Sequence, residues 1–316
     1  MNIYNSIDEF SGKKGIVVTI GTFDGVHIGH RQIINNLLNS ARKLKCDSMV
    51  ITFNPHPRNV IRQENKTLKL LTTIKEKTRL LSELGVDNLI VQPFNKGFSN
   101  LSPEEFVCGM LLQKIDIRKL IIGYNHKFGK NRTGSYEDLK EISRKYSFEV
   151  EVVPEFTFNT AHVSSTRIRE AIAYGRMEDA SSMLGYDYSL EGVVEKGNGE
   201  GRTLGFPTAN LLVSTEKLIP SNGVYAVIVG INNQLHNGML NIGHRPTMYD
   251  NSSKTIEVHL IEFDKDIYLE NLTVYFKKRI RNEIRFTNKQ QLISQLNIDK
   301  HLIMELLTSK GDKSNA

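Results

Sequence analysis

The stretch "GTFDGVHIGH" (residues 21–30) follows directly on the apolar run "GIVVTI" (15–20). The apolar run predicts a buried strand, and the residues after it predict a helix because apolar side chains recur there at helical spacing. These side chains are Ile33, Ile34, Leu37, Leu38, Ala41 and Leu44. A glycine-rich turn between a strand and a helix brings backbone amides and the positive end of the helix dipole to a phosphate group. By itself the stretch also fits a plain turn in which two histidines happen to fall.

The neighbouring sequence repeats this strand and helix alternation. Further strands are predicted at 48–53, 88–94, 119–124 and 148–153. Helices are predicted near 74–84, 103–112 and 136–145, the last of them capped by Ser135. Alternating strands and helices indicate an α/β fold, a Rossmann-like, doubly wound parallel sheet that binds its ligands at the carboxyl ends of the strands. Residues 21–30 lie at such an end.

After about residue 185 the pattern changes to strands without helices between them. Strand-like segments occupy 193–194, 223–231, 235–243, 255–263 and 271–280, separated by Gly and Asn turns. This pattern predicts an antiparallel barrel or sandwich. One closing helix is predicted from the apolar spacing of Leu292, Ile293, Leu296, Ile298, Leu302, Ile303 and Leu306. We therefore predict two domains, 1–184 and 185–316, with the boundary near 185–192.

Composition excludes several classes of protein. Of the 316 residues, 39% are hydrophobic and 24% charged, as in globular rather than disordered or membrane chains. No apolar run approaches the roughly 18 residues that a membrane span needs, and the first ten residues lack the pattern of a secretory signal. Cys46 and Cys108 form no metal or disulfide framework. We expect a cytoplasmic protein without a membrane partner.

The net charge of +6 and the pI of about 9.1 suit phosphate-bearing ligands, whether nucleotides or nucleic acid. The densest basic run, "FKKRIRNEIR" (276–285), alternates with apolar residues as a strand does. We interpret it as a solvated strand face, because the chain has no Trp and few of the interleaved aromatic residues of single-strand binders. No nucleic-acid partner is expected, and the chain is expected to be a monomer or a weak oligomer.

His27 and His30 are three residues apart at the entry to the predicted helix, so both can face one ligand. Imidazoles placed there can donate hydrogen bonds to the charge that builds on a triphosphate during nucleotidyl transfer. A preorganised donor of this kind contributes about 3 kcal/mol. No general base is needed if the nucleophile is already an anionic phosphate.

The first half of the chain resembles a known superfamily. His27, Ile28, Gly29 and His30 match the "HIGH" signature of nucleotidyltransferases and class I tRNA synthetases. The prefix "GTFDGVH" is similar to the adenylyltransferase module of bacterial bifunctional riboflavin kinase/FAD synthetases. The stretches "TFNPHPR" (52–58), "IIGYNHKFGKNRTGS" (121–135) and "VSSTRIRE" (163–170) extend this resemblance.

The resemblance implies specific roles for residues of the first domain. His27, His30 and Arg169 would be catalytic, with Arg169 bracing the β and γ phosphates of ATP. The expected ATP-binding residues are Gly21, Phe23, Asp24, Gly29, Asn125, Ser164, Ser165 and Thr166. Taken alone, the serines and Thr166 are also typical of a helix cap. The family often has Arg or Lys at the position of His162, which supplies a charge only when protonated.

In the second domain, the stretch "GNGEGRTLGFPTAN" (197–210) is rich in glycine but lacks the "GK[ST]" of a Walker loop. Thr208 and Asn210 alternate in an extended segment, so both side-chain oxygens can point to one side and bind Mg²⁺ together with ATP phosphates. Composition alone favours a polar turn. "PTAN" (207–210), "NGVYA" (222–226) and "NIGHRPT" (241–247), however, resemble flavokinases.

This second resemblance implies an ATP and flavin site and a base. "EVHLIEFDKDIY" (257–268) is similar to the stretch that carries the family's catalytic glutamate, which makes Glu257 the expected base for the riboflavin 5′-hydroxyl. Leu269 follows where the family usually has Gly. "RIRNEIRF" (279–286) resembles a ligand-contacting stretch. The implied kinase residues are Gly201, Arg202, Gly205, Pro207, Thr208, Asn210 and Arg281, with Thr208 and Asn210 as the metal ligands.

These observations predict a bifunctional enzyme that phosphorylates riboflavin with ATP and Mg²⁺ and then transfers AMP from ATP to FMN, giving FAD and pyrophosphate. Two other classes remain open. A nucleotidyltransferase with another acceptor, such as a pantetheine or glycerol phosphate, would leave the motifs of the second domain without purpose. A basic RNA-binding protein would bind more weakly as salt rises and would not turn over riboflavin.

Overall fold

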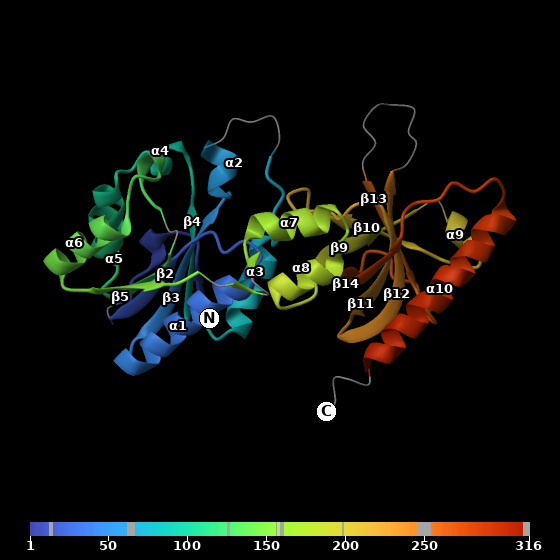
Figure 1. The fold of residues 1–316 in the computed structure, drawn as a ribbon, viewed down its shortest axis with the longest axis horizontal. Helices are drawn as coiled ribbons and strands as arrows, with labels where there is room; N and C mark the ends of the chain where they lie inside the picture. Colours follow the sequence, from blue (N-terminus) through green and yellow to red (C-terminus); the bar gives the residue numbers. More distant parts are fainter. Residues whose placement is uncertain are drawn as a thin grey trace. The chain divides into compact units, whose positions relative to one another are not determined.

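The computed structural model describes residues 1–12, 15–61, 67–124, 127–155, 157–158, 161–197, 199–244 and 254–311 (Figure 1). Its contacts divide the chain into two compact units, Met1–Ser165 and Thr166–Ala316. This division groups helices α7 (Ser165–Ala173) and α8 (Met177–Leu184) with the second unit. The expected domain boundary after residue 184 would place both helices in the first domain, and that boundary stays a prediction.

The first unit is built on a six-stranded parallel sheet with the strand order β1-β4-β3-β2-β5-β6. Its strands are β1 (Asn2–Tyr4), β2 (Ile16–Ile20), β3 (Asp47–Asn54), β4 (Asn88–Pro93), β5 (Ile117–Gly123) and β6 (Glu149–Val153). The five strands predicted from apolar runs are confirmed. β1 was not predicted, because three partly polar residues carry no periodic signal.

Helices connect these strands, as the alternating pattern predicts. They are α1 (Ile28–Leu44), α2 (Pro57–Ile61), α3 (Ile74–Glu83), α4 (Lys96–Ser99), the π-helical η2 (Glu105–Leu111) continued by α5 (Leu112–Lys114), and α6 (Tyr136–Tyr146). Two 3-10 turns, η1 (Ile7–Glu9) and η3 (Lys130–Arg132), and a small hairpin of β7 (Thr157–Phe158) and β8 (Ala161–His162) complete the unit. Ser135 caps α6 in a capping box with Asp138, which confirms the expected helix start.

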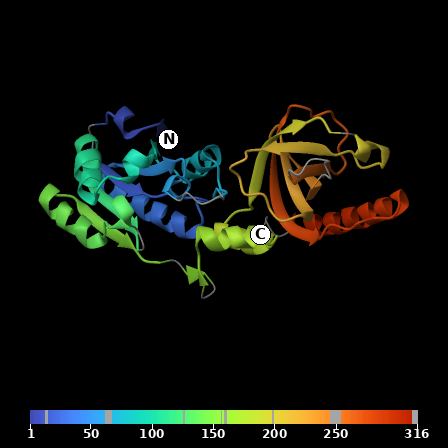
Figure 2. The same ribbon diagram turned by 90° about the horizontal axis from the view of Figure 1, so that it is seen from above.

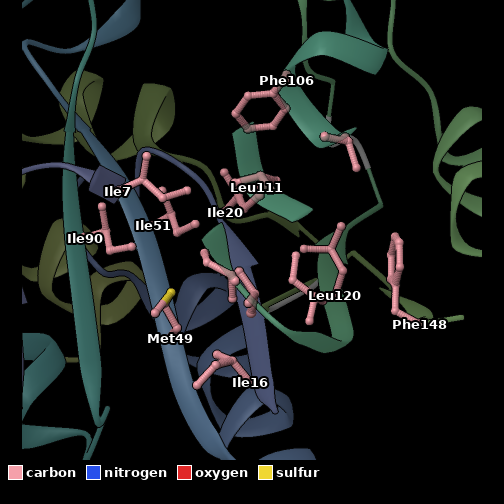
Figure 3. Close-up of a cluster of buried hydrophobic side chains, with 14 of the residues drawn as sticks. Ile7, Ile16, Ile20, Met49, Ile51, Ile90, Phe106, Leu111, Leu120 and Phe148 are labelled. Atoms are coloured by element: carbon pink, nitrogen blue, oxygen red, sulfur yellow. The ribbon is translucent and has the colours of Figure 1, made fainter. Parts of the chain in front are cut away.

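The core of the first unit explains why β2 is apolar throughout. Ile16, Val18 and Ile20 belong to a buried cluster with Met49 and Ile51 of β3 (Figure 3). Because side chains alternate along a strand, Val17 and Thr19 point to the other face, and α1 lies against β2, β3 and β5. β2 is therefore buried on both faces, and the turn after β2 begins from a rigid strand end.

The second unit contains a closed antiparallel barrel with the strand order β10-β13-β12-β11-β14-β9 (Figure 2). Its strands are β9 (Ser189–Glu195), β10 (Ala209–Val213), β11 (Gly223–Ile231), β12 (Gln234–His244), β13 (Lys254–Leu260) and β14 (Asn271–Arg281). The sequence left a barrel and a sandwich open, and the pairing of β10 with both β9 and β13 closes the barrel. The basic run at 276–285 begins as strand β14, as its alternation indicated.

The closing helix is α10 (Lys289–Gly311), which lies against β11 and β12. Ile303 inserts from this helix into a buried cluster with Phe206 and Met239. The short helix α9 (Glu200–Thr203) precedes β10, and α8 lies against β14. No helix within the described ranges is both long enough and apolar enough to cross a membrane.

Candidate active sites

The turn after β2 has an unusual backbone. Phe23 and Val26 adopt left-handed conformations with φ of 44° and 36°, and Gly25 lies between them with φ of 85°. Both Phe23 and Val26 are buried. A left-handed conformation costs a residue other than glycine about 1–2 kcal/mol. The surrounding contacts must therefore hold this turn in place.

His27 is the N-cap of α1, and its Nδ1 accepts a hydrogen bond from the backbone N–H of His30 at 3.3 Å. The proton of a neutral His27 is therefore on Nε2. The two rings stack, with centroids 3.6 Å apart and planes inclined by 16°. Burial, followed by the charges of His27 and Lys77, holds the pKa of His30 well below its usual value. The histidine pair thus presents a neutral His30 at the start of a helix.

Asp24 points inward rather than toward solvent. Its carboxylate accepts hydrogen bonds from the backbone N–H groups of Leu71 and Thr72 at 3.0 and 3.1 Å, and the residue is buried. The Thr72 hydroxyl in turn accepts from the N–H of Gly25 at 3.0 Å. The structure therefore places Asp24 as a tie between the turn and the segment before α3, and its expected contact with ATP stays a prediction.

A buried lysine that the motif analysis missed completes this cluster. The Nζ of Lys77, on α3, donates to the carbonyl oxygen of Thr22 at 2.6 Å and to the Thr52 hydroxyl at 3.2 Å. Burial lowers the pKa of Lys77 to about 8, although the Asp24 carboxylate opposes this shift. The helical spacing contained a signal, because Lys77 stands three residues after Ile74 and three before Leu80, on the apolar side of its helix.

The other predicted residues of this site fall in three groups. Gly21 and Gly29 lie in the turn and in the first turn of α1, and the Ser165 hydroxyl donates to the backbone oxygen of Asp24 at 3.0 Å. Ser164 directly precedes α7, whereas Thr166 and Arg169 lie on it and belong to the second compact unit. Asn125 lies outside the described residues.

His162, which stands where the family often has a basic residue, lies beside an acid. Its Nδ1 is 2.8 Å from Oε2 of Glu155, and the Tyr124 hydroxyl donates to the other carboxylate oxygen of Glu155. The side chain of His162 is largely exposed. A protonated His162 would therefore pair with Glu155.

In the second unit, the glycine-rich stretch forms a compact turn before β10. The backbone N–H of Phe206 donates to the carbonyl oxygen of Gly201 at 2.9 Å. A Cβ at Gly201 would overlap the carbonyl oxygen of Phe206 and would lie 3.2 Å from the Thr208 hydroxyl. Gly205 has φ of 80°, a conformation that glycine adopts without strain. Arg202 is exposed on α9, and Pro207 and Thr208 are exposed after the turn.

The barrel brings two predicted residues of the kinase site together. Asn210 of β10 and Glu257 of β13 are register partners, so their side chains lie on the same face of neighbouring strands. Asn241 of β12 is the register partner of Glu257 on its other side. Glu257 thus stands between two amide side chains, and sequence reasoning had not identified Asn241 as part of this row.

His259 contacts the glycine-rich turn before β10 through Pro207 and Phe206. Its Nδ1 lies 2.8 Å from the carbonyl oxygen of Pro207, and its ring packs edge-to-face with Phe206 at 5.3 Å. Burial lowers the pKa of His259, so the ring is neutral near pH 7. Since a carbonyl can only accept, Nδ1 carries the proton. His259 therefore holds the segment that leads to Thr208.

Arg281, expected to contact a ligand, makes an internal ion pair. Its Nε lies 2.9 Å and its Nη2 2.7 Å from Oδ2 of Asp299, a fully buried residue of α10. Gln295 also donates to Asp299. This pair fixes α10 to the end of β14, and a ligand contact by Arg281 stays a prediction.

Comparisons with known proteins agree with the two-unit arrangement. Residues 10–167 match the family model described as FAD synthetase, and residues 184–307 match the one described as riboflavin kinase. A bifunctional riboflavin kinase/FMN adenylyltransferase of Listeria monocytogenes is 38% identical over 284 residues, covering 90% of both chains. The Escherichia coli K12 protein of the same name is 34% identical, covering 91% of both chains.

A solved structure is similar to almost the whole chain. It is titled as a macrolide-efflux protein from Streptococcus pneumoniae, with a TM-score of 0.88 and 31% identity. The similarity covers 96% of the chain described here and 98% of the chain in the solved structure. The chain described here belongs to the bifunctional riboflavin kinase/FMN adenylyltransferase family.

Proposed function

We propose that the barrel unit phosphorylates riboflavin to FMN and that the turn after β2 is the site where AMP is transferred from ATP to FMN. Membership of the bifunctional family supports both activities. The observation that carries the assignment of sites is that one chain holds two separate constellations. One is the stacked His27–His30 pair, and the other is Glu257 opposite Asn210.

Adenylyl transfer needs little acid–base chemistry. A phosphate oxygen of FMN attacks the α-phosphorus of ATP, a new P–O bond forms, and the bond to the bridging oxygen breaks to release pyrophosphate. Because the FMN phosphate is already anionic, no base has to remove a proton. His27 and His30 donate hydrogen bonds to the charge that develops on the transferred and leaving groups. The N-terminal end of α1 adds further donors for phosphate, and the Ser165 hydroxyl can donate to phosphate when it releases the backbone oxygen of Asp24.

Phosphorylation of riboflavin does require proton removal. Glu257 accepts the proton of the 5′-hydroxyl as its oxygen bonds to the γ-phosphorus, and ADP leaves when the bond between the β-γ bridging oxygen and the γ-phosphorus breaks. Asn210 and Asn241, on either side of Glu257, can orient its carboxylate by donating from their amides. His259 and Gly201 shape the turn over which the ATP phosphates lie.

Both reactions of this family use ATP, typically with a divalent metal, and the residues present fit Mg²⁺. The Thr208 hydroxyl and the Asn210 side-chain oxygen are hard, neutral donors that suit this ion when phosphates and water complete its shell. Thr208 is exposed, and the Asn210 amide lies against Gly197, where a Cβ would displace it. Bound Mg²⁺ would neutralise charge on the transferred phosphoryl group. Among the described residues, no cluster of His, Cys, Asp and Glu offers a competing metal site.

The proposal also covers location and assembly. Cys46 and Cys108 are free thiols, as expected of a protein in a reducing cytoplasm. We propose a monomer or weak oligomer that acts on riboflavin, FMN and ATP and binds neither nucleic acid nor membranes. Light scattering across a range of protein concentrations tests the oligomeric state.

The experiment that tests the function is direct. Purified protein is incubated with riboflavin, ATP and Mg²⁺, and the flavins are separated by chromatography. We expect FMN to appear first and FAD to follow, and we expect FAD alone when FMN replaces riboflavin. Folded protein that forms neither product would overturn the proposal.

A further inference from the structure

Lys77 is a buried lysine to which the two reactions above give no role. Only 4% of its surface is exposed. Its Nζ donates to the carbonyl oxygen of Thr22 at 2.6 Å and to Oγ1 of Thr52 at 3.2 Å, and that hydroxyl donates to the same carbonyl at 3.1 Å. The three groups form a closed ring of hydrogen bonds at the point where β2 gives way to the turn.

This position matters because the turn is strained. Phe23 and Val26 remain left-handed only if their neighbours hold them. The backbone of Leu71 and Thr72 holds the Asp24 carboxylate on one side, and Lys77 holds the carbonyl just before Phe23 on the other. His27 follows directly after Val26, so its placement depends on both ties.

The charges around Lys77 support a role for its proton. The buried carboxylate of Asp24, in the turn, attracts the ammonium, and burial lowers the pKa of Lys77 to about 8. His30 of α1 also interacts electrostatically with Lys77, and the buried Glu76 precedes Lys77 on α3. Lys77 also helps to lower the pKa of His30. The ammonium therefore balances Asp24 and favours the neutral form of His30.

We propose that Lys77 is a positioning residue for adenylyl transfer, whose ammonium holds the Thr22 carbonyl and balances Asp24 so that the turn presents His27 and His30 to ATP. This inference rests on the proposed assignment of adenylyl transfer to this site. Lys77 acts through the turn and does not itself touch the reacting atoms.

The proton of Lys77 has opposite effects on activity and on stability. As the pH rises through about 8, the ammonium loses its proton, the Thr22 contact weakens and Asp24 is left unbalanced. The lysine of an unfolded chain keeps its proton up to about pH 10.4. Between these values the unfolded state binds more protons, so the contribution of Lys77 to the free energy of unfolding rises with pH. A loss of activity in this range thus marks lost positioning rather than unfolding.

The experiment uses the full chain and measures kcat/KM for FAD formation from FMN across about pH 6.5 to 9.5. Because kcat/KM reports the free enzyme, a site that needs this proton loses about twentyfold in activity between about pH 7.5 and 9.5. K77M should lose at least about thirtyfold at pH 7.5 while riboflavin phosphorylation persists. K77R keeps its charge at every pH, so it should retain activity and lose the alkaline decline.

Two further variants keep the test decisive. T52V removes an acceptor that favours the ammonium, so the alkaline decline should move to lower pH even if arginine does not fit. K217M removes another buried lysine, in the second unit, and should leave FAD formation unchanged.

The inference fails if K77M stays within about threefold of the parent protein, or if both K77R and T52V show the parent's alkaline decline unaltered. Absence of FAD formation by the parent protein at every pH would instead overturn the proposed function.

Discussion

The guanidinium of Arg281 contacts both carboxylate oxygens of Asp299, with Nε 3.0 Å from Oδ1 and 2.9 Å from Oδ2. The side chain of Asp299 is 1% exposed, and that of Arg281 is 16% exposed. A basic residue that the sequence offered as a ligand contact is therefore the anchor of α10. Since α10 also supplies Ile303 to the barrel core, this ion pair couples the helix to the kinase unit.

Breaking the pair should destabilise the barrel. In D299N the charge of Arg281 stays buried without its partner, and such a loss costs about 3–5 kcal/mol. The change in the free energy of unfolding is measured by chemical denaturation, with riboflavin kinase activity as the signal for the folded barrel. E305Q is the matched control, because Glu305 forms an exposed pair with His301 on the same helix and should change stability by less than about 0.5 kcal/mol. Equal effects of the two variants would contradict the anchoring role.

Loss of one histidine of the stacked pair should separate the two activities. We expect H30A to lower kcat for FAD formation by about 10²-fold, because a preorganised donor to developing charge is lost. FMN formation from riboflavin should remain unchanged. H301A, which removes an exposed histidine of α10, serves as the control. A parallel fall in both activities of H30A would show that the residue is not confined to adenylyl transfer.

The reverse separation is expected at the barrel. E257Q removes the proposed base, and general-base catalysis contributes about 10²–10⁴-fold, so FMN formation should fall by that factor while supplied FMN is still converted to FAD. Glu195 offers a sharp control, because it is the register partner of Asn210 on β9 and is exposed. If E195Q lost kinase activity and E257Q did not, the base would be wrongly assigned.

Acid should destabilise the kinase unit partly through His259. Burial lowers the pKa of this residue when the chain is folded, whereas an unfolded histidine has a pKa of about 6.5. The unfolded state therefore binds more protons as the pH falls below about 6.5, and stability is lost in that direction. H259L should flatten this acid dependence in urea titrations and should also raise the KM for ATP in FMN formation, because Pro207 loses its donor. An unaltered acid slope would exclude His259 as its source.

Replacing Leu269 with glycine should stabilise the protein. Its φ of 66° is left-handed and its side chain is 81% exposed. Glycine removes a strain of about 1–2 kcal/mol and adds an entropic cost of about 0.5–1 kcal/mol, so L269G should raise the free energy of unfolding by up to about 1.5 kcal/mol. L235G, at an exposed leucine of β12 with ordinary φ, should instead lower it. Denaturant midpoints of L269G, L235G and the parent protein measure these changes, and a midpoint of L269G below that of the parent protein would contradict the prediction.

Much of the fold could be predicted because its signals are local. Buried parallel strands such as β2 are continuous apolar runs. Helices such as α6 are recognisable from the helical spacing of their apolar residues and from a capping residue, here Ser135. β1 was not predicted, and β10 was recognised only as an extended segment. Both are strands because they pair with segments far away in the sequence. No local pattern could distinguish a sandwich from a barrel closed through β10.

The candidate sites divide in the same way. The residue types and spacing of the motifs pointed to His27 and His30, and the family resemblance pointed to Asn210 and Glu257; the roles of all four stay predictions. Contacts over long sequence separations were needed to find Lys77 beside Thr22 and His259 beside Pro207. Asp24 and Arg281 show what the motifs do not reveal, because each of these charged residues also makes contacts within the protein, with Leu71 and with Asp299 respectively.

By itself, the sequence determined the two kinds of unit, most of their strands and the residue types available for phosphate and proton chemistry. These follow from hydrophobic periodicity and from short motifs, which act over a few residues. Only the tertiary structure decided which charges are buried and what they contact. Burial and pairing depend on segments brought together from far apart in the chain, and only the structure therefore shows the internal contacts of Lys77, Asp24 and Arg281.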